Sequence, residues 1–150
     1  MPDESVLKDL FDRWERVWHE GRFDLIPECM AQAYIRHDEL GDRTVTPEAY
    51  AKEIAAAQQA RPNTRFAVYG HTFAGDRAWF PFTLKWNDAS TGEPRTRAGM
   101  QLYRVEAGKL AETCLTLLPL CSVGPDAGAK EHWTGRACWF RLSIRFWTRR

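Results

Sequence analysis

The stretch Arg97–Pro119, RAGMQLYRVEAGKLAETCLTLLP, decides the fold. It predicts two long strands joined by a tight turn within VEAGK, where Gly108 can take a positive φ. The residues on either side of the turn are mostly apolar or β-branched, as is typical of strands that bury one face. A hairpin of this length bends and needs a cover on one side, so we expect earlier helical segments to pack against it.

Three segments before the hairpin carry helical signals. The first spans residues 4–20, where apolar residues recur at helical spacing and Gly21 follows as a C-terminal cap. A second, short helix is expected over 25–33. The third begins at Pro47 behind the capping residue Thr46 and ends near residue 60. Together they supply the cover that the hairpin needs.

The remaining segments predict further strands. A short strand is expected over 33–38 and a loop over 39–45, and strands over 66–73 and 77–86 follow the third helix. Pro81 predicts that the last of these carries a bulge or lies at an edge. A turn-rich loop, NDASTGEP, leads into the hairpin. The expected order is α-α-β-α followed by four antiparallel strands.

Composition limits the function classes. A chain of 150 residues predicts one domain, and a net charge of +1 gives no general reason to expect nucleic-acid binding. The four cysteines show no CxxC or Cys/His metal spacing, so no metal site is expected. The first residues lack the apolar core of a signal peptide, and no apolar run is long enough for a membrane span. We therefore expect a cytoplasmic protein with reduced thiols.

The last fifteen residues, 136–150, differ from the body of the chain. They contain five arginines and no acidic residue, interleaved with aromatic side chains. Such a tail could bind a membrane surface or nucleic acid, but it could equally be an added edge strand, a dimer contact or an extension foreign to the domain. We expect a single domain over 1–135 with this tail as a separate element.

The order of these elements resembles the NTF2-like superfamily, in particular its small SnoaL-like and ketosteroid-isomerase-like bacterial members. The first matching feature is the helix–Gly–short helix–strand segment WHEGRFDLIPECMAQAYIRHD, and the second is the Pro-initiated third helix. The third is the hairpin GMQLYRVEAGKLAET, which is similar to the family pattern G-x-D-x-x-R-x-x-x-G-K-I-x-E. The resemblance covers residues 4–120.

The resemblance implies an α+β fold, a cone in which three N-terminal helices pack on a strongly curved, mainly antiparallel sheet around a cavity. It also implies a homodimer formed through the exposed sheet face. Catalytic members carry out cofactor-free proton transfer in the cavity, as polyketide cyclases, isomerases or dehydratases (lyases). The expected substrate is a small apolar or aromatic carbonyl compound, with no cofactor, no nucleic acid and no membrane partner.

Two residues are the catalytic candidates. His37 aligns with the aspartate base of the isomerases, and an imidazole with a pKa near ~6.5 can take and return a proton at neutral pH. Gln101 aligns with the aspartate of the G-x-D motif, where an amide could donate a hydrogen bond to an enolate oxygen. Each could instead be structural, His37 as a polar residue at a strand end and Gln101 as a buried amide.

Four further residues are expected to line the substrate site: Trp14, Tyr34, Trp86 and Tyr103. Trp14 aligns with the tyrosine that stabilises the oxyanion in the isomerases, but an aromatic ring at this position could equally belong to the core. Two hypotheses follow. The chain is either an enzyme with His37 as its base, or a binding or dimerisation module that uses the same cavity without chemistry. An enclosed pocket in which His37 and Gln101 converge would favour the enzyme.

Overall fold

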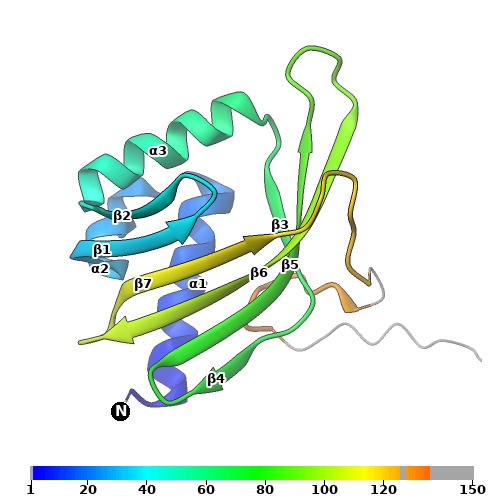
Figure 1. Ribbon diagram of the computed structural model, residues 1–150. Coiled ribbons are helices and arrows are strands. Elements are labelled where there is room, and N and C mark those ends of the chain that lie inside the picture. Colours follow the sequence, from blue (N-terminus) through cyan, green and yellow to red (C-terminus); the bar gives the residue numbers. More distant parts are fainter. Residues whose placement is uncertain (1, 126–127, 136–150) are drawn as a thin grey trace, which may run out of the picture.

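The computed structural model describes residues 2–125 and 128–135, and the tail expected over 136–150 lies outside them. Figure 1 shows a curved sheet with helices on one side. The elements are α1 (Glu4–Glu20), the single 3₁₀ turn η1 (Phe23–Leu25), α2 (Ile26–Cys29), β1 (Met30–Asp38), β2 (Gly41–Val45), α3 (Pro47–Ala60), β3 (Arg65–Val68), β4 (Thr72–Ala74), β5 (Arg77–Asn87), β6 (Pro94–Glu106) and β7 (Lys109–Leu117). The α+β cone expected from the sequence is confirmed.

The predicted hairpin is the centre of the sheet. β6 and β7 pair from Gly99 opposite Leu117 to Glu106 opposite Lys109. The two residues of the turn, Ala107 and Gly108, both have positive φ, at 49° and 74°. Positive φ at both central positions is the feature of a type I′ turn, whose twist matches that of the strands it joins. The turn therefore joins β6 and β7 with a twist that suits their pairing.

The sheet has the order β2-β1-β7-β6-β5-β3, and β4 pairs with β5 beyond the end of β3. The pairings are antiparallel except that β1 runs parallel to β7. This one parallel pairing brings residues near 35 next to residues near 112, far apart in the sequence. It also places β1 between the hairpin and β2, at the side of the sheet where α3 lies (Figure 1).

The helices cover one face of the sheet, which we call the inner face. From α1, the side chains of Leu7, Leu10, Phe11, Trp14 and Val17 are buried. The Phe11 ring lies 4.7 Å from the Phe80 ring of β5 and 5.1 Å from the Tyr103 ring of β6. These contacts pack α1 across the strands, and Figure 1 shows this helix running behind them.

The ends of several elements differ from the sequence prediction. The second helix ends at Cys29, and β1 begins at Met30, earlier than expected. The loop expected over 39–45 contains β2, which turns back along β1 to form a short hairpin. The strand expected over 66–73 is divided into β3 and β4. Pairing with neighbouring strands determines where these elements begin and end. The propensities of the individual residues therefore could not predict these boundaries.

Pro81 explains the division of that strand. β5 is an inner strand, so the expectation of an edge position is wrong. β3 pairs with β5 as far as Phe82, and β4 begins its pairing at Trp79, so the neighbouring strand is interrupted beside Pro81. Proline has no N–H that could donate to a neighbouring strand. A gap in the strand beside Pro81 therefore leaves no backbone N–H of Pro81 without a partner.

The face of the sheet turned away from the helices is called the outer face here. It includes the partly exposed side chains of Trp79 and Met100. The expectation of a homodimer through this face stays a prediction. Among residues 2–125 and 128–135, no helix is both long and apolar enough to cross a lipid bilayer.

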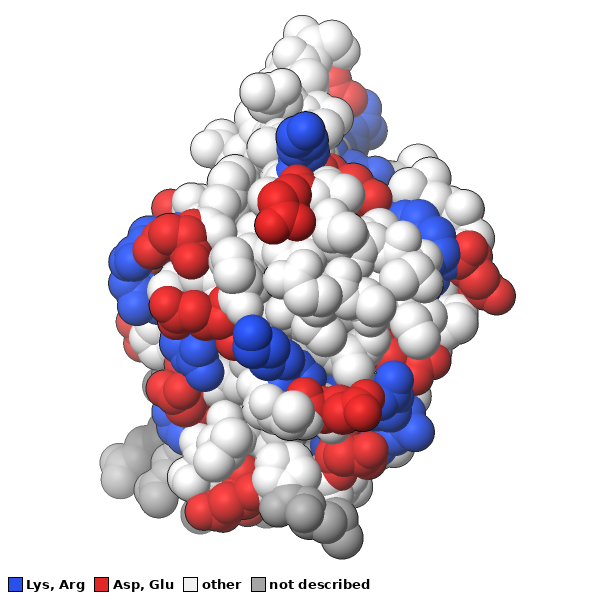
Figure 2. Space-filling view, turned by 90° about the vertical axis from the view of Figure 1, so that its left-hand side faces the viewer, with Lys and Arg blue, Asp and Glu red and all other residues white. Residues whose placement is uncertain are grey.

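Charged side chains are mixed over the surface rather than separated by sign. Figure 2 shows lysines and arginines next to aspartates and glutamates around a wide area of other residues on the face it displays. Over the described surface as a whole, many oppositely charged residues form ion pairs in which at least one partner is well exposed, such as Lys8 with Asp12 and Arg22 with Asp24. Pairs of this kind add little to stability. That face shows no extended basic area of the kind that nucleic-acid binding uses.

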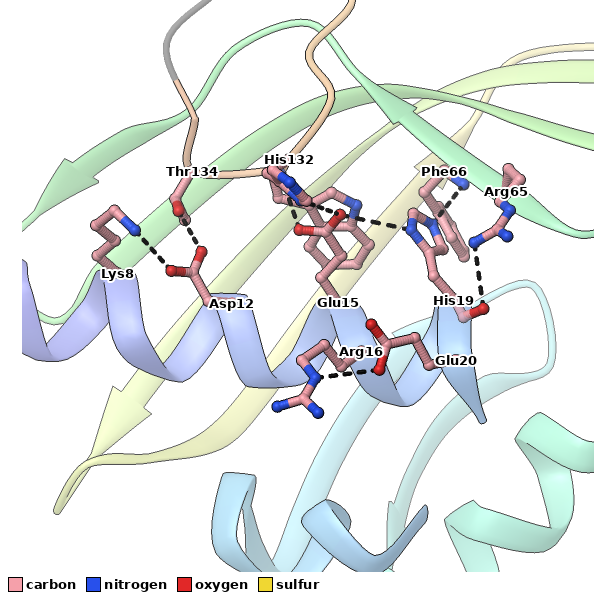
Figure 3. A network of polar contacts seen from close by, with 11 residues as sticks. Lys8, Asp12, Glu15, Arg16, His19, Glu20, Arg65, Phe66, His132 and Thr134 are labelled. Carbon is pink, nitrogen blue, oxygen red and sulfur yellow. Dashed lines mark hydrogen bonds and ion pairs between the residues drawn. The ribbon is translucent and has the colours of Figure 1, made fainter. Parts of the chain in front are cut away.

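The segment before residue 136 folds back onto α1. The Trp133 ring is buried 5.7 Å from both the Phe66 and the Phe80 rings. Its backbone N–H donates to a carboxylate oxygen of Glu15 at 3.1 Å. His19 and His132 also lie beside that carboxylate, at 3.5 and 3.4 Å (Figure 3). Glu15 therefore anchors the end of the described chain to the first helix.

Burial raises the pKa of Glu15, but hydrogen bonds from His19 and the Trp133 N–H lower it by more, so the net shift is downward. A carboxyl whose folded-state pKa is lowered adds stability above its unfolded pKa, and this stability is lost as the pH falls through the folded value. We expect Glu15→Gln to lower the free energy of unfolding by about 1.5 kcal/mol at pH 7. The difference should shrink towards pH 3.

Chemical denaturation at pH 7 and pH 3 measures this effect. Glu28→Gln is the matched control, because Glu28 is an exposed glutamate 3.5 Å from Arg13. It should change stability by less than about 0.5 kcal/mol at either pH. An unchanged stability of Glu15→Gln at pH 7 would show that the buried carboxylate does not anchor the segment.

Gly99 provides a second prediction. A Cβ built at this position would lie 2.6 Å from the backbone oxygen of Thr116 and 2.9 Å from the Phe82 ring. Because a backbone oxygen in the central ladder cannot move away, Gly99→Ala should destabilise the fold by about 2 kcal/mol. Thermal or chemical unfolding measures this loss, and Gly128→Ala, with 3.8 Å to its nearest neighbour, is the control. Equal stability of both variants would contradict the close approach.

Candidate active site

A cavity of about 420 Å³ lies between α3 and the inner face of the sheet. Much of its wall is apolar and aromatic, with polar side chains from β1, β2, α3 and β6. The lining residues are Trp18, Arg36, Asp38, Glu39, Leu40, Arg43, Tyr50, Glu53, Ile54, Ala56, Ala57, Arg61, Thr64, Phe66, Phe82, Leu84, Gln101, Tyr103, Leu115 and Leu117. The polar groups of this cavity define the candidate site.

The alternation of side chains along β1 selects which of its residues reach the cavity. Successive side chains of a strand point to opposite faces. Arg36 and Asp38 line the cavity, whereas His37 between them lies on the outer face. The neighbouring strand β2 adds Arg43, which pairs in register with Arg36 and lines the cavity with it.

These residues form a chain of ion pairs along the cavity wall. An Asp38 oxygen lies 3.1 Å from the Arg36 guanidinium, and its other oxygen lies 2.6 Å from that of Arg43. Arg43 in turn contacts Glu53 of α3 at 2.6 Å. The chain joins β1, β2 and α3, and so it closes the side of the cone while placing two cations and two carboxylates at the cavity.

Arg36 is the buried cation of this chain. Its guanidinium lies 4.6 Å from the Tyr50 ring centroid and 5.7 Å from that of Tyr34, a cation–π arrangement. Burial lowers the pKa of Arg36, but the facing tyrosines and Asp38 raise it by more, so the net shift is upward. The group therefore stays charged at any pH at which the protein is folded.

Asp38 is ionised at neutral pH. Burial raises its pKa, but hydrogen bonds from Arg43 and from the Leu40 backbone N–H, together with Arg36, lower it below its usual value. The carboxylate is therefore a negative charge in the cavity wall that is free of a proton.

Gln101 and Tyr103 supply the polar groups of β6. The Tyr103 hydroxyl donates to the amide oxygen of Gln101. Burial raises the pKa of Tyr103 well above its usual value, so its hydroxyl keeps its proton. Because the Gln101 amide oxygen is used in this way, its NH₂ group is the part that can donate to a ligand. Both residues line the cavity.

Other predicted residues occupy different positions. Trp14 and Tyr34 are fully buried in the core, where the Tyr34 hydroxyl is hydrogen-bonded to that of Thr113. Trp86 lies under the Arg61 guanidinium, 5.4 Å from it, and is not among the described residues that line the cavity. The Trp14 indole nitrogen is buried without a hydrogen-bond partner in the described part of the chain.

The expectation that His37 faces the cavity is wrong. Its Nδ1 lies 2.7 Å from an Asp42 oxygen and its Nε2 lies 2.9 Å from a Glu112 oxygen, with 34% of the side chain exposed. All three residues are on the outer face of the sheet. The position of His37 therefore gives no support to a role of His37 as the base. Its neighbour Asp38 lines the cavity, where the resemblance had placed His37.

Sequence reasoning missed Arg36, Asp38, Arg43 and Glu53. The signal for the first two was the alternation in YIRHD, which puts both on the face of Tyr34, an aromatic residue suited to the core. For Arg43 and Glu53 the sequence held no signal, because the first lay in an expected loop and the second on a polar turn of α3.

The comparison with protein-family models agrees with this fold. The model described as a SnoaL-like domain matches residues 11–113. The chain belongs to this family. A comparison with curated proteins gives no match.

Several solved structures are similar to this chain. One, described as a "putative polyketide cyclase" from Acidithiobacillus ferrooxidans, is 19% identical with a TM-score of 0.68, covering 78% of this chain and 91% of that one. IdmH from Streptomyces antibioticus, also described as a "putative polyketide cyclase", is 15% identical, with a TM-score of 0.63 and coverages of 73% and 90%. A "putative isomerase" of the SnoaL-like family from Agrobacterium tumefaciens is 19% identical, with a TM-score of 0.60 and coverages of 77% and 99%. At these identities the likeness shows the fold.

The burial of the Arg36 guanidinium in the cavity wall gives a prediction. Arg36→Lys should destabilise the protein by about 2 kcal/mol, because one ammonium group cannot lie over the Tyr50 ring and also replace the two contacts that Nε and Nη2 of Arg36 make with Asp38. Arg61→Lys is the control, since Arg61 also lies over an aromatic ring but is exposed. Its change should stay within about 0.5 kcal/mol in chemical denaturation. Equal effects would show that burial of Arg36 has no special energetic role.

Proposed function

We propose that the chain is an enzyme that transfers a proton within a small apolar carbonyl compound, as a cyclase or isomerase of the SnoaL-like type, without a cofactor. The observation that carries the proposal is that an ionised carboxylate, a fixed cation and an amide donor line one largely apolar cavity. The volume, about 420 Å³, lies within the range of small-molecule sites. The descriptions of the related structures as cyclases and isomerases support the same reaction class.

Asp38 is the base in this proposal. Its carboxylate takes a proton from the carbon next to the substrate carbonyl, and the C–H electron pair moves into the carbonyl group to form an enolate. If the substrate carries a β,γ double bond, the enolate is a dienolate, and Asp38 returns the proton to the γ-carbon, which completes an isomerisation. Alternatively, the enolate carbon attacks a second carbonyl of the same molecule and closes a ring, and the alkoxide that forms takes the proton back from Asp38.

The enolate oxygen is stabilised by groups that already stand in the cavity. The Gln101 NH₂ donates a hydrogen bond, and Tyr103 holds the Gln101 amide in the orientation that exposes this donor. The buried Arg36 guanidinium adds a positive charge that needs no reorganisation during the reaction. Fixed donors in a water-poor site stabilise developing charge more effectively than water does.

A second candidate is a ligand-binding module without chemistry. The observation in its favour is that two arginines hold Asp38, which makes it a weaker base than an isolated carboxylate. In that case Arg36 and Gln101 would recognise the oxygen of a bound carbonyl compound, and no proton would move.

Proton exchange distinguishes these two functions without knowledge of the product. The protein is incubated in D₂O with a panel of small cyclic and aromatic ketones, and loss of α-proton signals is followed by NMR. The enzyme should accelerate exchange for at least one ketone over buffer. Asp38→Asn should reduce that rate at least about 100-fold. Gln101→Leu should reduce it as well, while the ketone still binds.

Asp24→Asn is the matched control, because Asp24 is an exposed aspartate paired with Arg22. Thermal unfolding of each variant verifies that it is folded. Exchange by folded Asp38→Asn at the wild-type rate would overturn the role of Asp38. Binding of a ketone without any exchange would favour the ligand-binding module instead.

A further inference from the structure

A second group of reactive side chains lies on the outer face, away from the cavity. The parallel pairing of β1 with β7 sets His37 beside Cys114, and Glu112 precedes Cys114 by two residues on the same face. One nitrogen of His37, one oxygen of Glu112 and the sulfur of Cys114 all lie within 4.8 Å of one another. Imidazole, carboxylate and thiol are the three side-chain types that bind zinc.

The histidine is already oriented for such a role. Asp42 of β2 pairs in register with His37, and its carboxylate lies 2.7 Å from Nδ1. Without a metal, Nε2–H donates to Glu112 at 2.9 Å. An Nδ1–H that donates to Asp42 holds the ring in place when a metal ion takes the position of the Nε2 proton, which passes to solvent. A histidine that binds a metal through one ring nitrogen usually donates a hydrogen bond from the other nitrogen to a carboxylate or another acceptor, which fixes the orientation of the ring.

Glu112 is held in the same way. Its Oε2 accepts a hydrogen bond from Arg104 at 2.8 Å, which leaves Oε1 on the side of His37. A divalent ion with a Cys114 thiolate, the two carboxylates of Glu112 and Asp42, and the Arg104 cation would make a group with no net charge. The surrounding charges are therefore matched to an ion with two positive charges.

The geometry and access suit a small ion. Tetrahedral zinc holds its ligand atoms roughly 3.3–3.7 Å apart, as its bond lengths require. The three ligand atoms already lie within 4.8 Å of one another, so movements of about 1 Å would bring them to that spacing. His37 and Glu112 are 34% and 26% exposed, so an ion can enter from solvent and water can complete the shell.

We propose that His37, Glu112 and Cys114 bind a Zn²⁺ ion on the outer face of the sheet. Binding forms bonds from the metal to Nε2, Oε1 and the sulfur, and the thiol proton and the Nε2 proton pass to solvent. Nitrogen and sulfur ligands favour zinc over magnesium or calcium, which prefer oxygen. The site is separate from the cavity, because His37 and Asp38 point to opposite faces, so the proposal goes beyond the proposed enzymatic function.

Cobalt reports on this site directly. Co²⁺ takes zinc positions, and its bond to a thiolate produces a charge-transfer absorption band. The purified full-length protein, treated with a chelator and reductant, is titrated with Co²⁺ and then with Zn²⁺. We expect one Co²⁺ per chain, a thiolate band and displacement of the band by Zn²⁺.

Variants identify the ligands. Cys114→Ser should remove the band, and His37→Gln should weaken binding at least tenfold. Asp42→Asn, which changes the support of the histidine, should weaken it about tenfold. A variant that combines Cys121→Ser and Cys138→Ser, and so keeps Cys114, is the matched control and should bind as the wild type does.

The opposite results would overturn the proposal. Absence of stoichiometric Co²⁺ binding, or a thiolate band that survives Cys114→Ser, would show that His37 is only part of a surface ion-pair network with Asp42 and Glu112. Circular dichroism of each variant verifies that a loss of binding does not come from unfolding.

Discussion

The parallel pairing of β1 with β7 is the constraint on which the rest of the structure depends. It fixes β1 against the central hairpin, with Arg36 beside Thr113 and His37 beside Cys114. Because side chains alternate along a strand, one register decides the content of both faces. Arg36 and Asp38 enter the cavity, and His37 joins the outer face. A shift of one residue would exchange the two sets.

The ion-pair chain from Asp38 to Glu53 shows how the fold can keep charges at a cavity. Burying a charge is costly unless it is paired and hydrogen-bonded. Arg36 meets this condition through Asp38 and the tyrosine rings. Arg43 then links Asp38 to α3, so the groups that would act on a substrate also join the helix layer to the sheet. In this way structure and proposed chemistry use the same contacts.

The sequence predicts the fold well because its signals are local. The turn at Gly108, the cap at Thr46 and the end of α1 at Gly21 each appear in the structure where the residues indicate them. The site was less predictable. The inner-face positions of Gln101 and Tyr103 can be predicted from their places in the hairpin, but His37 lies on the face opposite to the expected one. The alternation of side chains in YIRHD indicates this outer position, whereas the alignment of His37 with the base of the isomerases pointed to the cavity.

Long-range pairing explains what local patterns could not provide. No spacing rule brings together His37 and Cys114, and the exclusion of a metal site was based on cysteines and histidines close in the sequence. Only the parallel pairing of β1 and β7 places these residues side by side. Likewise, Arg43 reaches the cavity because residues 41–45 pair with β1 rather than forming a loop.

The most direct test of the central claim is a crystal structure of the protein with phenol, an enolate analogue. The account predicts phenol in the cavity, with its oxygen about 3 Å from the Gln101 amide nitrogen or the Arg36 guanidinium and its ring near Asp38. His37 should remain on the opposite face of the sheet. Phenol bound against His37, or a His37 ring that enters the cavity, would contradict the account.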